Sequence, residues 1–160
     1  MEARRGSSRS RGFSKERELA RKLWSMGFAC VRGPASGAKA KHVLQPDIVA
    51  IRNGRVLVIE VKTRRKSSTI YVEKEQIEKL EEWRRRIGES CVPLVAVYVG
   101  REMGWRFVTI DGLERTRSGN AKVTREALSR AHDLLSLKNL TDPHVSRIDS
   151  YRLQNRDGLP

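Results

Sequence analysis

Two carboxylates and a lysine stand on either side of a predicted two-residue turn. Asp47 follows a proline and opens an apolar run, while Glu60 and Lys62 lie near the end of a second apolar run. Asn53-Gly54 separates the two runs, and this dipeptide is a strong β-hairpin signal because both of its residues tolerate positive φ angles. We therefore expect two antiparallel strands paired about this turn.

The expected register of the hairpin decides where these side chains lie. If Arg52 pairs with Arg55, Asp47 lies directly opposite Glu60, with the two Cβ atoms about 5 Å apart. Lys62 is two residues beyond Glu60 and shares its face of the sheet. Two like charges repel at this distance, and a divalent cation between them would remove the repulsion.

Simpler explanations exist for each of these acids. An aspartate after proline often only caps a turn, which would account for Asp47. Glu60 sits among valine, leucine and isoleucine and needs a partner or a metal, because a buried charge is costly. Lys62 could supply that partner in an ordinary structural ion pair.

A third carboxylate favours the metal. Glu16 precedes Leu19, Ala20 and Leu23 at helical spacing, so it lies on the apolar stripe of a predicted helix. Its alternative role is a favourable charge in the first helical turn. A helix packed on the hairpin would bring Glu16 to Asp47 and Glu60.

Three oxygen ligands without a nearby histidine or thiolate favour Mg²⁺ or Mn²⁺ over zinc. A metal held in this way could bind a scissile phosphate and activate a water molecule. A lysine beside it would orient the nucleophile or stabilise developing charge, which is the role we expect for Lys62.

The charge balance indicates a polyanionic partner. The chain has 160 residues, with 33 Lys and Arg against 19 Asp and Glu, for a formal net charge of +14. Such a basic domain favours nucleic acid, and an anionic membrane less so. The expected DNA contacts are basic residues next to Glu16, on either side of the loop that holds Ser36, or directly after the hairpin: Arg17, Arg32, Lys39, Arg64, Arg65 and Lys66. Each of them alone is better explained as a solvated surface charge, and it is their grouping next to three acids that favours a phosphate substrate.

Several classes of protein are not expected. Cys30 and Cys91 fall in apolar runs without a CxxC motif, and the three histidines are scattered, so we expect no zinc site. The longest apolar run, residues 92–99, is too short to cross a bilayer. We expect a soluble cytoplasmic protein with no membrane partner and no small-molecule cofactor.

The predicted elements indicate an α/β fold with a central mixed β-sheet flanked by helices. Helices are expected from about Ser14, as N-cap, to Met26, and over residues 73–87 and 124–135. Strands are expected over 28–32, the two hairpin arms, 70–72, 92–99 and 105–110. A basic flexible arm (1–12) precedes the folded domain (13–137), and a disordered tail (138–160) follows it.

The chain resembles the archaeal Holliday junction resolvases, a branch of the PD-(D/E)xK, restriction-endonuclease-like nucleases. The resemblance covers roughly residues 12–135. It is carried by Gly12-Phe13-Ser14-Lys15-Glu16-Arg17-Glu18-Leu19, Gly27-Phe28-Ala29-Cys30-Val31-Arg32, Pro34-Ala35-Ser36-Gly37, Pro46-Asp47-Ile48-Val49-Ala50, Ile59-Glu60-Val61-Lys62, the segment from Tyr71-Val72 to Gln76, and Gly104-Trp105-Arg106-Phe107.

The resemblance implies a restriction-endonuclease-like nuclease domain and specific roles. Glu16, Asp47 and Glu60 would bind metal and Lys62 would be catalytic. A serine and neighbouring arginines would assist at the phosphate, which by matching position are Ser36, Arg17 and Arg32. The resemblance also implies a homodimer that cuts opposing strands of a four-way junction symmetrically, in homologous recombination and repair.

We therefore expect a Mg²⁺-dependent, structure-specific DNA endonuclease that hydrolyses its substrate directly, because no nucleophilic Cys/His or Ser/His pair is visible. One alternative is another nuclease of the superfamily, acting on flaps, nicks or linear DNA. A second is a non-catalytic junction-binding scaffold. The repelling pair Asp47 and Glu60 counts against the scaffold, which has no need of it.

Overall fold

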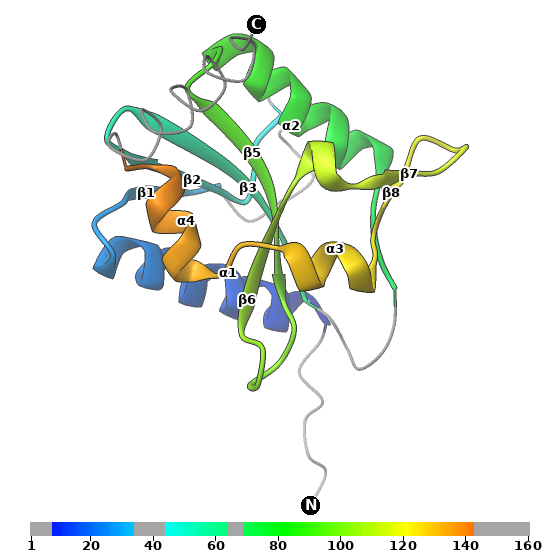
Figure 1. Cartoon of the computed structure of the whole chain (residues 1–160), viewed down its shortest axis with the longest axis horizontal. Helices are drawn as coiled ribbons and strands as arrows, with labels where there is room; N and C mark the ends of the chain where they lie inside the picture. The colour runs from blue at the N-terminus through cyan, green and yellow to red at the C-terminus, as the bar shows by residue number, and fades with distance from the viewer. Residues whose placement is uncertain (1–7, 34–43, 64–68, 143–160) are drawn as a thin grey trace, which may run out of the picture.

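A mixed five-stranded sheet forms the centre of the computed structural model, which describes residues 8–33, 44–63 and 69–142 (Figure 1). Its strand order is β1-β2-β3-β5-β6, and all neighbours are antiparallel except β3 and β5. The strands are β1 (Ala29–Arg32), β2 (Ile48–Arg52), β3 (Arg55–Thr63), β5 (Cys91–Tyr98) and β6 (Trp105–Thr109). The expected α/β fold with a mixed, helix-flanked sheet is confirmed.

The β2–β3 hairpin has the predicted turn and register. Asn53 and Gly54 have φ angles of 50° and 75°, the positive values that a type I′ turn requires. Arg52 pairs with Arg55, and the register continues to Ile48 opposite Ile59. Continued by one residue, this register places Asp47, in the bend before β2, opposite Glu60.

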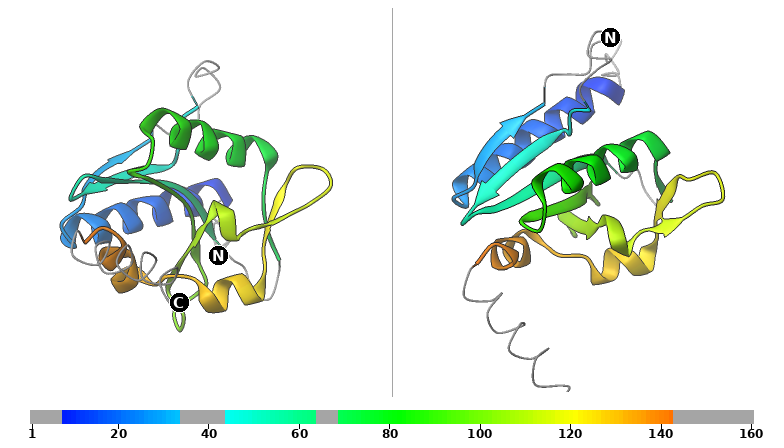
Figure 2. Two further views of the ribbon diagram at one scale, coloured as in Figure 1. Left: turned by 45° about the horizontal axis from the view of Figure 1, so that its top comes forward. Right: turned by 90° about the horizontal axis from the view of Figure 1, so that it is seen from above.

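The two faces of the sheet bury separate apolar clusters, because successive residues of a strand point to opposite sides. Helix α1 (Ser8–Ser25) packs Leu19 and Leu23 on one face, together with Leu137 of α4 (Leu134–Leu140). Helix α2 (Lys74–Ile87) packs Ile77 and Leu80 on the other face. Figure 2 shows α1 and α2 along the sheet. The parallel strand β5 lies between both clusters, as its continuous apolar run indicates.

Two helix predictions were wrong. Helix α1 begins at Ser8 rather than after Ser14, so residues 8–12, expected in the basic arm, are helical. Gly12 inside the helix costs about 1 kcal/mol, which the packing of the later turns offsets.

The predicted helix over 124–135 is two helices, α3 (Arg125–Arg130) and α4. Between them His132 exchanges two backbone hydrogen bonds with Phe107 on the edge strand β6, at 2.8 and 3.0 Å, and this extended pairing interrupts the helix. Residues 138–142, expected in the tail, continue α4 and its C-terminal cap, and Thr141 is buried.

A second sheet was not predicted. It has the order β4-β8-β7, with β4 (Ile70–Val72), β7 (Glu114–Arg115) and β8 (Ala121–Val123). The loop joining β7 and β8 extends away from the body of the molecule (Figures 1 and 2). Within the described ranges, no helix has both the length and the apolar character needed to cross a membrane.

Candidate active site

Four side chains predicted from the sequence come from three elements of one corner of the fold. Glu16 lies in α1, Asp47 immediately precedes β2, and Glu60 and Lys62 lie in β3. The negative charges of Asp47 and Glu60 both raise the pKa of Glu16, so the three carboxylates lie close enough to interact. Helix α1 thus brings a third acid within electrostatic reach of Asp47 and Glu60, and the metal-binding role of the three acids stays a prediction.

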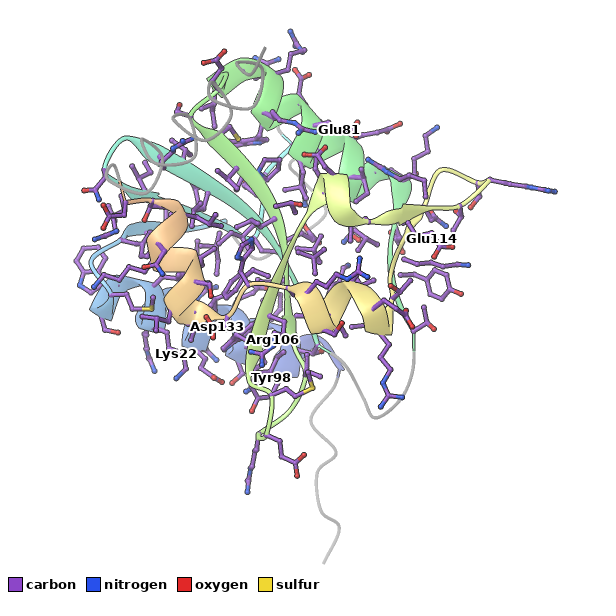
Figure 3. The ribbon with its side chains drawn as sticks, viewed as in Figure 1. Lys22, Glu81, Tyr98, Arg106, Glu114 and Asp133 are labelled. Atoms are coloured by element: carbon purple, nitrogen blue, oxygen red, sulfur yellow. The ribbon has the colours of Figure 1, made fainter. Side chains whose placement is uncertain are left out.

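The middle of α1, which carries Glu16, contacts strands β5 and β6. The ammonium of Lys15 lies 3.4 Å from the centre of the Tyr98 ring, and Tyr98 stacks at a tilt on Trp105. Glu18 accepts hydrogen bonds from Lys15 at 2.5 Å and from the indole of Trp105 at 3.4 Å. Figure 3 labels Tyr98 where these strands pass α1. A cation–π contact backed by an ion pair thus orients the helix turn that holds Glu16.

Asp47 is held by the backbone of the two neighbouring strands. Its Oδ2 accepts a hydrogen bond from the N–H of Val61 at 2.7 Å, and its carbonyl accepts one from the N–H of Gly33 at 2.9 Å. A Cβ atom at Gly33 would collide with the carbonyl oxygen of Pro46. A glycine at this position lets the chain entering β2 lie close against the end of β1.

Glu60 is the buried charge of the site, with 2 % of its surface exposed. Its Oε1 accepts a hydrogen bond from Nε2 of Gln76 at 2.5 Å, and its Oε2 accepts one from Nζ of Lys79 at 2.6 Å. Both donors belong to α2. Hydrogen bonds to both oxygens offset the desolvation of a buried carboxylate.

Lys62 and Glu60 are connected mainly by hydrogen bonds to the side-chain amide of Gln76, which lies between them. Its ammonium donates to Oε1 of Gln76 at 2.6 Å and lies 3.6 Å from Oε1 of Glu60. The amide of Gln76 therefore accepts from the lysine with one end and donates to the glutamate with the other. This bridge fixes the direction in which the lysine points.

Burial and mutual repulsion raise the pKa of two of the acids. Loss of solvent, followed by the negative charge of Asp47, raises the pKa of Glu16 to about 7. Burial and then the charge of Glu60 raise the pKa of Asp47. These are the shifts expected of carboxylates gathered in a low-dielectric corner, a pattern common at functional sites.

The other predicted site and DNA-binding residues divide into three groups. Arg32 lies at the site, with its Nε 3.9 Å from Oε2 of Glu16; within the described ranges this buried nitrogen has no hydrogen-bond partner. Arg17 is exposed on α1. The remaining predicted residues lie outside the described parts of the chain: Ser36, Lys39, Arg64, Arg65 and Lys66.

The donor atoms suit a hard cation, although their present positions do not enclose one. Glu16, Asp47 and Glu60 offer only carboxylate oxygens, which Mg²⁺ and Mn²⁺ prefer. Within 8–33, 44–63 and 69–142, no three Asp, Glu, His or Cys side chains lie so as to hold a metal ion. Both oxygens of Glu60 are engaged by α2 instead. The chemistry of the donor set fits, and the side chains would have to rearrange.

Gln76 and Lys79 were missed as site residues. They are three residues apart, on the same side of α2 as the buried positions Ile77 and Leu80. Polar residues beside the apolar stripe of a helix are expected to reach the sheet, and this was the signal available in the sequence. Which strand residue they would meet depends on how α2 crosses the sheet.

Comparison with known proteins gives one consistent result. The family model described as "Archaeal holliday junction resolvase (hjc)" matches residues 7–143. The chain is 37% identical over 147 residues to the crossover junction endodeoxyribonuclease Hjc of Sulfurisphaera tokodaii, covering 91% of this chain and 98% of the relative. It is 31% identical to the protein of that name from Sulfolobus acidocaldarius, covering 91% and 99%.

A solved structure shows the same fold. The structure of Archaeoglobus fulgidus Hjc, described as a Holliday junction resolvase from an archaeal hyperthermophile, superposes with a TM-score of 0.69 at 31% identity. The match covers 81% of this chain and 99% of the other.

Proposed function

Because the chain belongs to the archaeal Holliday junction resolvase family, we propose that it is a Mg²⁺-dependent endodeoxyribonuclease that cuts four-way DNA junctions by paired, symmetric nicks. The observation that carries this proposal is the buried Glu60 facing Asp47, with Lys62 on the same strand and bridged to it by Gln76. A protein that only bound DNA would gain nothing from keeping two repelling acids together.

The proposed roles follow from the chemistry of the side chains. Glu16, Asp47 and Glu60 would hold the divalent cation, which when bound would polarise the scissile phosphate and lower the pKa of a water nucleophile. Lys62, held by Gln76, would donate to the attacking oxygen or to the charge that develops on the phosphate. Arg32, whose Nε is buried, would neutralise phosphate charge next to Glu16.

We further propose that the active protein is a homodimer. A four-way junction presents two strands for symmetric cutting, whereas the described part of each chain supplies a single cluster of this kind. Two copies related by a two-fold axis would match the two-fold symmetry of the paired cuts. Light scattering of the purified protein should give twice the mass of the 18.3 kDa chain.

The function is tested by incubating the protein and Mg²⁺ with labelled four-way junctions, and with linear duplex of equal length. We expect paired nicks near the crossover of the junction and no cutting of the duplex. Comparable cutting of the duplex would favour a broader nuclease. Binding without cutting in the presence of Mg²⁺ or Mn²⁺ would favour a junction-binding scaffold.

The site assignment is tested by Glu60→Gln. We expect cleavage to fall by at least about a thousandfold while junction binding is kept, because the amide removes a metal ligand and leaves the DNA contacts in place. Glu78→Gln is the matched control, since Glu78 lies on α2 with 55% of its side chain exposed and pairs with Lys74. Normal cleavage by Glu60→Gln would refute the assignment.

A further inference from the structure

Lys79 is a second lysine in the site, supplied by α2 and not by the ExK triplet. Its ammonium lies 2.6 Å from Oε2 of Glu60, closer than the ammonium of Lys62 lies to Oε1 at 3.6 Å. Only 13% of its side chain is exposed, against 22% for Lys62. Removing one partner of a buried, directly bonded ion pair costs more than removing one partner of a surface pair, because the other charge is left buried.

The charge of Lys79 also reaches the other two acids. It lowers the pKa of both Asp47 and Glu16, against the effect of burial. The ammonium of one residue therefore acts on all three carboxylates: through a hydrogen bond on Glu60 and through space on Asp47 and Glu16. Lys79 thus supplies positive charge to the same three acids that would hold a divalent cation.

The position of Lys79 on α2 explains how it reaches the site. Ile77 and Leu80 anchor the helix on the sheet face that carries Val58, and Glu60 lies two residues further along the same face of β3. Lys79 lies beside these anchors, three residues after Gln76, which bonds the other oxygen of Glu60. The helix thus delivers one donor to each oxygen.

We propose that Lys79 is an internal counter-ion of the carboxylate cluster: it holds Glu60 in the metal-free protein, competes with the divalent cation for Glu60, and thereby sets the metal affinity of the site. This inference rests on the proposed metal dependence. Lys79 is a positioning residue here, because it acts through Glu60. A cation held by Glu60 would take Oε2 from the ammonium of Lys79, which would then remain as a positive charge beside the carboxylates.

The test is Lys79→Met in the full-length protein, titrated with Mn²⁺ alone in the absence of DNA. Mn²⁺ binding is followed by the loss of the free-ion signal in electron paramagnetic resonance. Since a competing positive charge is removed, we expect the dissociation constant for Mn²⁺ to fall by about tenfold relative to the wild type. A residue that only supported the fold would leave this constant unchanged or raise it.

Thermal unfolding supplies an independent readout. In EDTA the variant should melt roughly 5 to 10 °C below the wild type, because Glu60 is left buried without its ammonium partner. Saturating Mn²⁺ should raise its melting temperature by more than it raises that of the wild type, since the ion replaces the missing charge.

Two further variants keep the test decisive. Lys79→Arg retains the charge and should restore the wild-type Mn²⁺ affinity, and Lys79→Gln serves if the methionine variant does not fold. Lys74→Met is the matched control: it removes one lysine charge from the same helix, at a side chain that is 55% exposed and pairs with Glu78.

The outcomes separate this inference from the function. If the wild type binds Mn²⁺ and the folded Lys79→Met variant, or Lys79→Gln in its place, binds it equally or more weakly, the inference is overturned and the proposed function stands. If the wild type binds neither Mn²⁺ nor Mg²⁺, both are overturned. Tighter binding by the Lys79 variants, without a change in Lys74→Met, supports the inference.

Discussion

At the scale of single residues, the amide of Gln76 connects Lys62 with Glu60. Its Oε1 accepts from Lys62 at 2.6 Å and from the backbone N–H of Glu73 at 3.1 Å, while its Nε2 donates to Glu60. One side chain thereby orients the lysine, positions the glutamate and satisfies a backbone donor at the start of α2. Loss of Gln76 should therefore change the cleavage rate more than the affinity for DNA.

Replacing Gln76 by leucine should lower the single-turnover cleavage rate by about a hundredfold, because Lys62 loses the acceptor that directs it. The dissociation constant for the junction should change by less than about threefold, since Gln76 lies at the acids and not on an exposed basic surface. Rate and affinity are measured separately, by quenched cleavage and by binding in Ca²⁺. A circular dichroism melt controls for folding. A wild-type cleavage rate would show that Lys62 does not need this bridge.

At the scale of elements, the close contact between the end of β1 and the entry to β2 positions Asp47. Gly33→Ala should place a methyl group against the carbonyl oxygen of Pro46 and displace Asp47, which Gly33 bonds. We expect cleavage to fall by at least about tenfold and stability by roughly 1–3 kcal/mol. Both are measured on the purified variant, by junction cleavage and by urea unfolding.

Gly12→Ala is the control for that substitution. Gly12 is inside α1, and within the described residues a Cβ there would meet nothing within 4 Å apart from its chain neighbours and the backbone of its own helix. Alanine there should stabilise the protein by up to about 1 kcal/mol through helix propensity and leave cleavage unchanged. If Gly33→Ala behaved in the same way, close packing at Pro46 would not matter for Asp47.

The short helix α4 depends on its N-cap. Asp133, labelled in Figure 3 at the start of α4, accepts a hydrogen bond from the N–H of Ser136 at 2.7 Å, and this bond lowers the pKa of its carboxyl group. Asp133→Ala should destabilise the protein by about 1 kcal/mol, lowering the melting temperature by about 2 to 4 °C.

The sign of the pH dependence follows from the lowered pKa. Because the folded protein holds the charged form more strongly than the unfolded chain, the stabilisation is present above the ordinary aspartate value of 3.8 and is lost as the pH falls through the lower folded value. Asp133→Asn caps without titrating, so its melting temperature relative to the wild type should rise as the pH falls below about 4. A difference that does not vary with pH would contradict this role.

At the scale of the whole molecule, the net charge of +14 should dominate DNA affinity. If about eight phosphates are neutralised, the logarithm of the junction binding constant should fall with the logarithm of salt concentration at a slope of about −7. Arg17→Gln should reduce this slope by about 0.9, since Arg17 is exposed next to Glu16. Arg86→Gln, at a residue paired with Glu82, should change it less. Fluorescence anisotropy at several salt concentrations measures both.

Several features could be predicted because short-range rules determine them. Asn53-Gly54 specifies a type I′ turn, and a period of two then sets Asp47 opposite Glu60 without further information. The continuous apolar run of β5 predicts a strand covered on both faces. Helix ends were less predictable. The break between α3 and α4 at His132 arises because the backbone of His132 pairs with Phe107 on the edge strand β6.

The sequence alone therefore determined the hairpin, the mixed α/β architecture and the identity of the acids and lysine that could perform the chemistry. Only the tertiary structure decided that α2 supplies Gln76 and Lys79 to Glu60 and that Arg32 approaches Glu16. The physical reason is the separation along the chain over which each kind of interaction acts. Turn geometry and strand alternation act over a few residues, whereas the meeting of a helix with a particular strand residue depends on how the two apolar clusters pack on the sheet.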